Sequence, residues 1–123
     1  MKTNFERIDP ILSVTDMAVA TSYYIEVLGF TKAPWSNERF GCVSRDGCSI
    51  YLASSGHGPL GAYVWVGVED VDALYRECQA SGAMVRATPA NYPWARQMEV
   101  SDPDGNILRF GSDVKEALLE SKP

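Results

Sequence analysis

Hydrophobic and polar residues alternate over positions 8–14, which is the period of a strand with one face in a core. Pro10 has no N–H group to donate to a neighbouring strand, so this strand is expected at a sheet edge. A helix should follow, because Asp16 is a preferred N-cap residue and Gly29 readily adopts the left-handed conformation that ends helices. The inward positions between them keep helical spacing and are Ala20, Tyr24, Val27 and Leu28.

Three strands are predicted in the rest of the first half, at Phe30–Trp35, Phe40–Arg45 and Cys48–Ala53. Asp46 and Gly47 separate the last two, and an Asp-Gly pair is a strong signal for a two-residue hairpin turn of type I′. The first half therefore has the predicted order β-α-β-β-β.

The second half repeats this pattern. Alternation returns over Ala62–Val68, Asp70 is a second N-cap residue, and Gly82 is a second helix stop. The inward positions of this helix are Val71, Leu74, Tyr75 and Cys78. Turn-forming residues fill positions 102–106 (Asp-Pro-Asp-Gly-Asn) and predict a hairpin between apolar strands. Equivalent signals recur about 55 residues apart, which indicates an internal duplication.

We therefore predict an α+β fold of two β-α-β-β-β modules with cupped mixed sheets, in one domain spanning residues 1–123. The expected parts are module one at 7–54, a Gly-rich linker at 55–61, module two at 62–111 and a tail at 112–123. A module alone would leave one sheet face bare, so the modules should pack together or exchange elements with a second chain. We expect a homodimer.

Composition narrows the class of protein. The chain is 46% hydrophobic and 22% charged, and it has no apolar run of the length that crosses a bilayer, which is about 20 residues. The N-terminus lacks the apolar core of a signal peptide, and three cysteines cannot all pair within the chain, so we expect a cytoplasmic protein with free thiols. The net charge of −5 disfavours nucleic acid as a partner and favours cationic ligands.

Several side chains are candidates for binding, and each has an alternative. Trp94 follows Pro93 in a polar loop, which favours exposure or ligand contact over the core. Tyr63 and Trp65 lie on the strand face opposite the valines. They are therefore as well suited to lining a groove or a dimer interface as to simple packing. Arg96 is either a ligand contact or an anchor for a carboxylate of its own chain.

The cysteines and the histidine carry no catalytic signal. Cys42, Cys48 and Cys78 have no C-x-x-C spacing, which favours structural thiols over a nucleophile or zinc. His57 lies in the Gly-rich linker and is expected to be a solvated side chain.

Five marks together resemble the vicinal oxygen chelate superfamily of glyoxalases, extradiol dioxygenases and bleomycin-resistance proteins. They are Val14-x-Asp16, Tyr23-Tyr24, Leu28-Gly29-Phe30, the run Val68–Leu74, and the turn at 102–106. The resemblance covers nearly the whole chain. It implies four metal-ligand positions, which correspond here to Asp9, Tyr51, Tyr63 and Arg109.

Metal-dependent members carry His, Gln or Glu at these positions. Only Asp9 is an ordinary ligand among the four, and Arg109 is a permanent cation. We therefore predict that the metal site is lost, with no catalytic residues and no cofactor.

The chain is more similar to the bleomycin-resistance branch, which binds drug without altering it. Pro10-Ile11-Leu12 resembles the point where the first strand of that family crosses to its partner chain. Residues resembling Phe40 and Trp94 sandwich the flat drug in that family, and acidic side chains receive its cationic tail. The expected ligand is a flat, cationic antibiotic of the bleomycin type. The expected binding residues are Phe40, Tyr51, Tyr63, Trp65, Trp94, Arg96 and Arg109.

Two alternatives remain open at this point. A metal-dependent glyoxalase or dioxygenase-like enzyme would need ligands that this sequence does not supply, and assays with added Ni²⁺, Zn²⁺ or Fe²⁺ would detect one. A small-molecule sensor would use the same groove, so the sequence does not separate it from a resistance protein.

Overall fold

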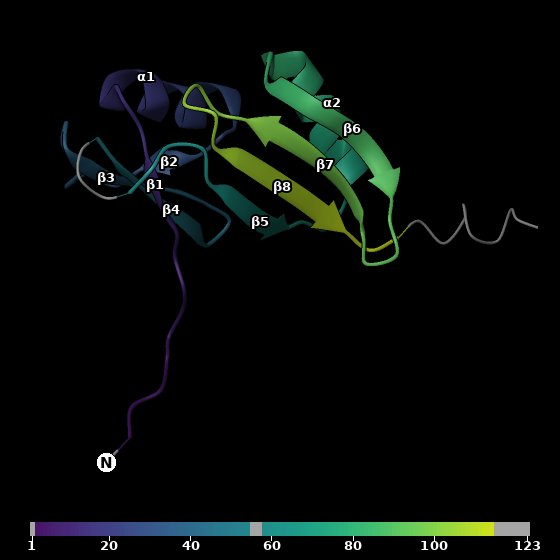
Figure 1. Cartoon of the computed structure of the whole chain (residues 1–123), viewed down its shortest axis with the longest axis horizontal. Helices are drawn as coiled ribbons and strands as arrows, with labels where there is room; N and C mark the ends of the chain where they lie inside the picture. The colour runs from purple at the N-terminus through teal and green to yellow at the C-terminus, as the bar shows by residue number, and fades with distance from the viewer. Residues whose placement is uncertain (1, 55–57, 115–123) are drawn as a thin grey trace, which may run out of the picture. The chain divides into compact units, whose positions relative to one another are not determined.

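The computed structural model describes residues 2–54 and 58–114, and the chain divides into two compact units between Leu60 and Gly61. Each unit contains one helical segment and one four-stranded sheet (Figure 1). The α+β class and the two β-α-β-β-β modules are thereby confirmed. His57 lies outside the described residues. No helix in the described part of the chain has the length and apolarity needed to cross a membrane.

The sheet of the first unit has the order β1-β4-β3-β2. Its strands are β1 (Ile11–Ser13), β2 (Thr31–Lys32), β3 (Phe40–Arg45) and β4 (Cys48–Ala53). β1 pairs parallel with β4 at the edge predicted from Pro10, and the other pairs are antiparallel. The helical segment comprises α1 (Met17–Ser22) and η1, a π-helical turn at Tyr23–Val27. Core side chains of this unit include Leu12, Val14, Ala20, Tyr24, Leu28, Val43, Ile50 and Leu52.

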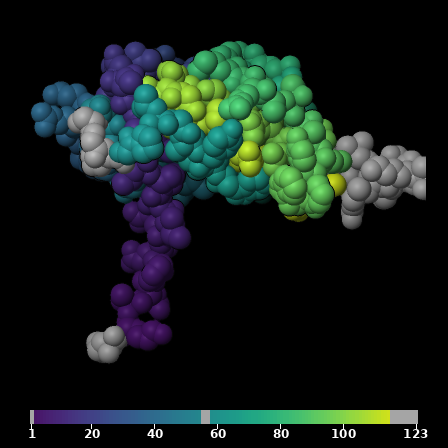
Figure 2. All heavy atoms as spheres, viewed as in Figure 1, coloured from purple at the N-terminus to yellow at the C-terminus, as the bar shows by residue number. Residues whose placement is uncertain are grey.

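Two strands of this unit are shorter than the sequence predicts. The alternation over 8–14 yields only β1, because the backbone ladder ends where the Tyr51 N–H donates to the Pro10 carbonyl at 2.9 Å. The predicted strand Phe30–Trp35 is reduced to β2, since the chain turns where the Ser36 N–H donates to the Ala33 carbonyl. Residues 2–8 are exposed, and their purple atoms form a narrow column in Figure 2.

The sheet of the second unit has the order β5-β8-β7-β6 and repeats the first. Its strands are β5 (Tyr63–Gly67), β6 (Met84–Asn91), β7 (Arg96–Ser101) and β8 (Ile107–Ser112). Helix α2 (Val71–Ser81) packs against β6, β7 and β8 (Figure 1). The core of this unit includes Val71, Cys78, Met98, Val100, Ile107, Leu108 and Phe110, so the predicted flanks of the last hairpin are buried.

The internal repeat extends to individual hydrogen bonds. The Val14 N–H donates to the carbonyl of Ala53 at the end of β4, and the Val68 N–H donates to the carbonyl of Gly111 in β8. Asp16 accepts a bond from the Val19 N–H, and Asp70 accepts bonds from the N–H groups of Asp72 and Ala73, so both predicted N-caps are confirmed. Both predicted helix stops, Gly29 and Gly82, have the left-handed conformation, with φ of 77° and 80°.

Candidate ligand-binding site

An aromatic cluster occupies the sheet of the first unit. Phe40 of β3 stacks on Tyr51 of β4 with 5.4 Å between ring centroids, and Trp35 stacks on Phe40 at 6.1 Å. The ring centroids of Trp35 and Tyr51 are 6.2 Å apart with 33° between their planes, so the three rings form a triangle. Phe40 and Tyr51 are half-buried, whereas Trp35 is 55% exposed. The cluster therefore brings together two predicted binding residues and presents Trp35, which the sequence analysis did not select.

The acidic candidate of this unit, Asp9, is already paired. Its carboxylate accepts a 2.6 Å bond from Arg7 Nε. Asp9 and, after it, the hydroxyl of Tyr51 raise the pKa of Arg7. The N-terminal segment thus carries a cation to the edge of the aromatic cluster.

The loop between β6 and β7 in the second unit presents Trp94. Its side chain is 64% exposed, which agrees with the exposure predicted from Pro93. Tyr92 stacks on one face of the indole, with 5.2 Å between centroids and 17° between the planes. The Trp94 Nε1–H donates to Oε1 of Gln97 at 2.7 Å, and Gln97 is itself buried. Both contacts hold the indole in one orientation while leaving much of its surface open to solvent.

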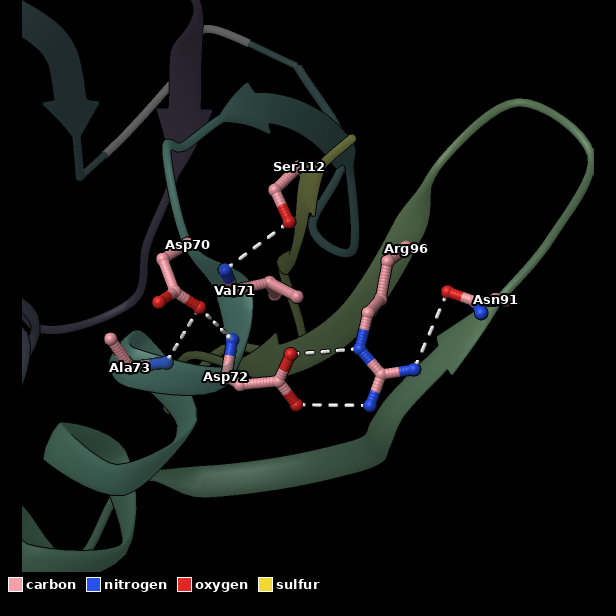
Figure 3. Close-up of polar contacts among 7 residues, drawn as sticks. All are labelled: Asp70, Val71, Asp72, Ala73, Asn91, Arg96 and Ser112. Carbon is pink, nitrogen blue, oxygen red and sulfur yellow. Dashed lines mark hydrogen bonds and ion pairs between the residues drawn. The ribbon is translucent and has the colours of Figure 1, made fainter. Parts of the chain in front are cut away.

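Arg96 anchors a carboxylate of its own chain, which is one of the two roles that the sequence allows. Its Nε and Nη2 donate to the two oxygens of Asp72 at 2.8 and 2.9 Å, and Nη1 donates to Oδ1 of Asn91 at 3.4 Å (Figure 3). The bond to Asp72 raises the pKa of Arg96. Asp72 stands in the first turn of α2, two residues after the N-cap Asp70, so the pair ties that helix to β7 (Figure 3).

The remaining predicted residues of this unit share one face of its sheet. Trp65 of β5 lies beside Arg109 of β8 in the register, and Arg109 lies opposite Glu99 of β7. The Arg109 guanidinium sits 5.1 Å from the centroid of the Tyr63 ring, a cation–π geometry. Tyr63, Trp65 and Arg109 are thus brought together, with Glu99 as a partner that the sequence analysis missed.

The chemistry at the four metal-ligand positions implied by the resemblance does not fit a divalent cation. In the first unit Asp9 is bound by Arg7, and Tyr51 lies in the aromatic cluster. In the second unit the Arg109 guanidinium is bound to Glu99 and lies over Tyr63. Over residues 2–54 and 58–114, no three His, Cys, Asp or Glu side chains gather closely enough to hold a metal. The loss of metal binding remains a prediction, which elemental analysis after dialysis would test.

A separate hollow of about 450 Å³ opens in the first unit beside α1 and η1. Its lining is mixed and includes Met17, Thr21, Ile25, Glu26, Lys32 and Asn37, and it contains none of the predicted binding residues. We place the candidate site at the aromatic side chains, because exposed aromatic rings held by fixed partners suit the binding of planar ligands better than this mixed recess.

The fold and these aromatic surfaces define a class of protein. The family model described as glyoxalase superfamily protein matches residues 1–117, and the chain belongs to that superfamily. This confirms the resemblance to the glyoxalase and bleomycin-resistance proteins. An uncharacterized protein of Mycolicibacterium smegmatis is 29% identical over 107 residues, which cover 85% of this chain and 91% of the relative.

Two solved structures connect the fold with antibiotic binding. TnmS3, an antibiotic-binding protein from Streptomyces sp. CB03234, is 28% identical with a TM-score of 0.77 over 92% of this chain and all of its own. The bleomycin-binding protein of Streptomyces verticillus, solved with copper(II)-bleomycin, is 25% identical with a TM-score of 0.76 over 93% of this chain and all of its own. The chain is structurally similar to antibiotic-binding members of the superfamily.

Proposed function

We propose that this protein sequesters a planar aromatic antibiotic in the cytoplasm without changing any bond in it. The observation that carries the proposal is Trp94, an exposed indole held by Tyr92 and Gln97. A ring that is already oriented loses little conformational entropy when a ligand stacks on it, so more of the contact energy appears as affinity. Similarity to antibiotic-binding proteins supports the same conclusion.

Antibiotics of the bleomycin type are the first ligands to test, with Trp94 and Phe40 as the proposed stacking residues. Phe40 is only half-buried and belongs to the cluster that exposes Trp35, so a planar ligand can meet more than one ring there. A stacked aromatic pair contributes about 0.5–1.5 kcal/mol beyond the area it buries. Non-covalent sequestration also suits a chain whose metal-ligand positions carry an arginine and two tyrosines.

Titration calorimetry with bleomycin tests this proposal. Truncating an anchor aromatic costs about 2–4 kcal/mol, so Trp94→Ala should weaken binding by a factor of roughly 30 to 1,000. Trp94→Phe is the matched control, because it keeps a smaller stacking ring while it loses the bond to Gln97. It should weaken binding by about threefold to tenfold.

Mass spectrometry of the drug recovered from the wild-type mixture should show an unchanged mass. No heat and no quenching of Trp fluorescence at high micromolar bleomycin would remove this drug from the proposal. A chemically altered drug would replace sequestration with catalysis.

A further inference from the structure

The sheet face of the second unit that carries Tyr63 and Trp65 is positively charged. Glu99 Oε2 accepts a 3.0 Å hydrogen bond from Arg109 Nε and lies 2.9 Å from Arg109 Nη2. Glu99 Oε1 lies 3.7 Å from Arg86 Nε. Two guanidinium groups therefore share one carboxylate. This cluster has a formal charge of +1 in a chain whose net charge is −5.

The cations of this cluster are more accessible than the anion. The Glu99 side chain is 14% exposed, whereas the side chains of Arg109 and Arg86 are 38% and 53% exposed. Both guanidinium groups also lie near the Tyr63 ring, with Arg109 at 5.1 Å and Arg86 at 5.9 Å from its centroid. Glu99 and Tyr63 hold the two arginines beside each other and leave guanidinium donors facing solvent.

A flat apolar surface adjoins the cations. Trp65 neighbours Arg109 in the register and is 51% exposed. Its six-membered ring takes the space of a side chain at Gly111, where a Cβ would lie 2.2 Å from Cη2. Gly111 is therefore the residue that lets the indole lie across β8. The result is an aromatic surface next to a pair of arginines.

We propose that this face binds a planar aromatic acid, with the ring on Trp65 and the anionic oxygen on Arg86 and Arg109. The inference goes beyond the proposed function, because Trp65, Arg86 and Arg109 are not its stacking residues, and it names the class of ligand group that this face selects. An aromatic carboxylate or ionised phenol supplies both parts, a π-face for the indole and an oxygen anion for the guanidinium donors. A cationic group would instead meet the like charge of the two arginines.

The test compares two probes that differ only in charge, 2-naphthoate and its neutral amide, 2-naphthamide. Binding is followed by the indole N–H resonance of Trp65 and by Trp fluorescence. We expect 2-naphthoate to bind about tenfold more tightly than 2-naphthamide, a difference in the range of partly exposed charge-assisted bonds. The difference should shrink at high salt, because the charges lie at the surface.

Two variants test the contact with the arginines, and a third variant serves as a control. Arg109→Gln and Arg86→Gln should each weaken 2-naphthoate by about threefold to tenfold and leave 2-naphthamide unchanged. Arg76→Gln removes a cation from the exposed side of α2 and should change neither probe. Arg86 is the more exposed of the pair, so Arg86→Gln keeps the test valid if Arg109→Gln fails to fold.

Equal affinities for the two probes, or no saturable shift of the Trp65 indole with 2-naphthoate, would overturn the inference. The naphthoate test and the bleomycin titration can succeed or fail independently of each other. Bleomycin binding without a preference for 2-naphthoate would overturn only the acid-binding face. A preference for 2-naphthoate without bleomycin binding would support this face and remove only the drug.

Discussion

Asp102 is the residue that holds the second hairpin together. It is almost fully buried, and its carboxylate accepts bonds from the N–H groups of Asp104 and Asn106 and from the Asn106 side-chain amide, at 2.8 to 2.9 Å. The Asn106 Oδ1 in turn accepts a bond from the Ala62 N–H at the entry to β5. The turn-forming residues at 102–106 therefore also fix where the first strand of this unit begins.

We predict that Asp102→Asn lowers the free energy of unfolding by about 1–3 kcal/mol, because an amide group would face donors that now meet a carboxylate. The matched control is Asp46→Asn in the hairpin of the first unit, where the side chain is 89% exposed and Asn tolerates the positive φ. The control should stay within about 0.5 kcal/mol of wild type. Urea denaturation measures the free energy of unfolding of both variants. Equal losses of stability in the two variants would contradict the role of Asp102.

At the scale of elements, the bidentate pair between Arg96 and Asp72 connects the start of α2 to β7. The two side chains are 16% and 23% exposed, which places the pair between a surface ion pair and a buried one. A planar guanidinium that meets both oxygens of a carboxylate fixes orientation as well as distance. The pair therefore sets the docking of the helix on its sheet, next to the loop that carries Trp94.

A double-mutant cycle on Arg96→Met and Asp72→Ala should give a coupling energy of about 1–2 kcal/mol. The same cycle on Arg45 and Asp46, which are 3.5 Å apart with an exposed carboxylate, should give less than about 0.5 kcal/mol. Thermal or urea unfolding of the single and double variants provides the energies. Similar couplings for both pairs would show that Arg96 contributes no more than a surface ion pair.

At the scale of the whole molecule, the N-terminal segment suggests a second copy of the chain. Phe5 and Ile8 are 91% and 87% exposed, and β1 begins directly after Pro10 at the edge of its sheet. Exposing large apolar side chains to water is unfavourable, and burying them against another chain would remove this cost. These features support the predicted homodimer with exchange of the N-terminal strand.

We predict that sedimentation velocity at micromolar concentration gives twice the mass of one chain. Changing Phe5 and Ile8 to Ser should weaken the dimer by about two decades or more, from about 1.5–3 kcal/mol of burial per side chain. Val19→Ser is the control, because Val19 is an exposed apolar residue of α1 outside this segment. A monomeric wild-type protein would contradict the prediction.

The sequence determined the order and the ends of most elements, because these depend on neighbouring residues. The N-caps at Asp16 and Asp70, the helix stops at Gly29 and Gly82, and the bounds of β3 and β4 all follow from local backbone preferences and period-two patterns. The prediction was less accurate where the end of an element depends on pairing with a strand that is distant in the sequence. The first strand was too long because alternation does not show where the parallel ladder with β4 ends.

The partners of the site residues were decided by the tertiary structure. The resemblance to the superfamily marked Phe40, Tyr51 and Arg109, and strand alternation marked Trp65, but their neighbours come from other strands and loops. Trp35 and Gln97 show no periodicity that links them to Phe40 or Trp94. Glu99 becomes the partner of Arg109 only through the register of β7 with β8, and Gly111 receives the Trp65 ring only because the two residues lie on adjacent strands. The net charge of the chain did not predict the local charge of this face, since pairing across strands determines which charges remain exposed.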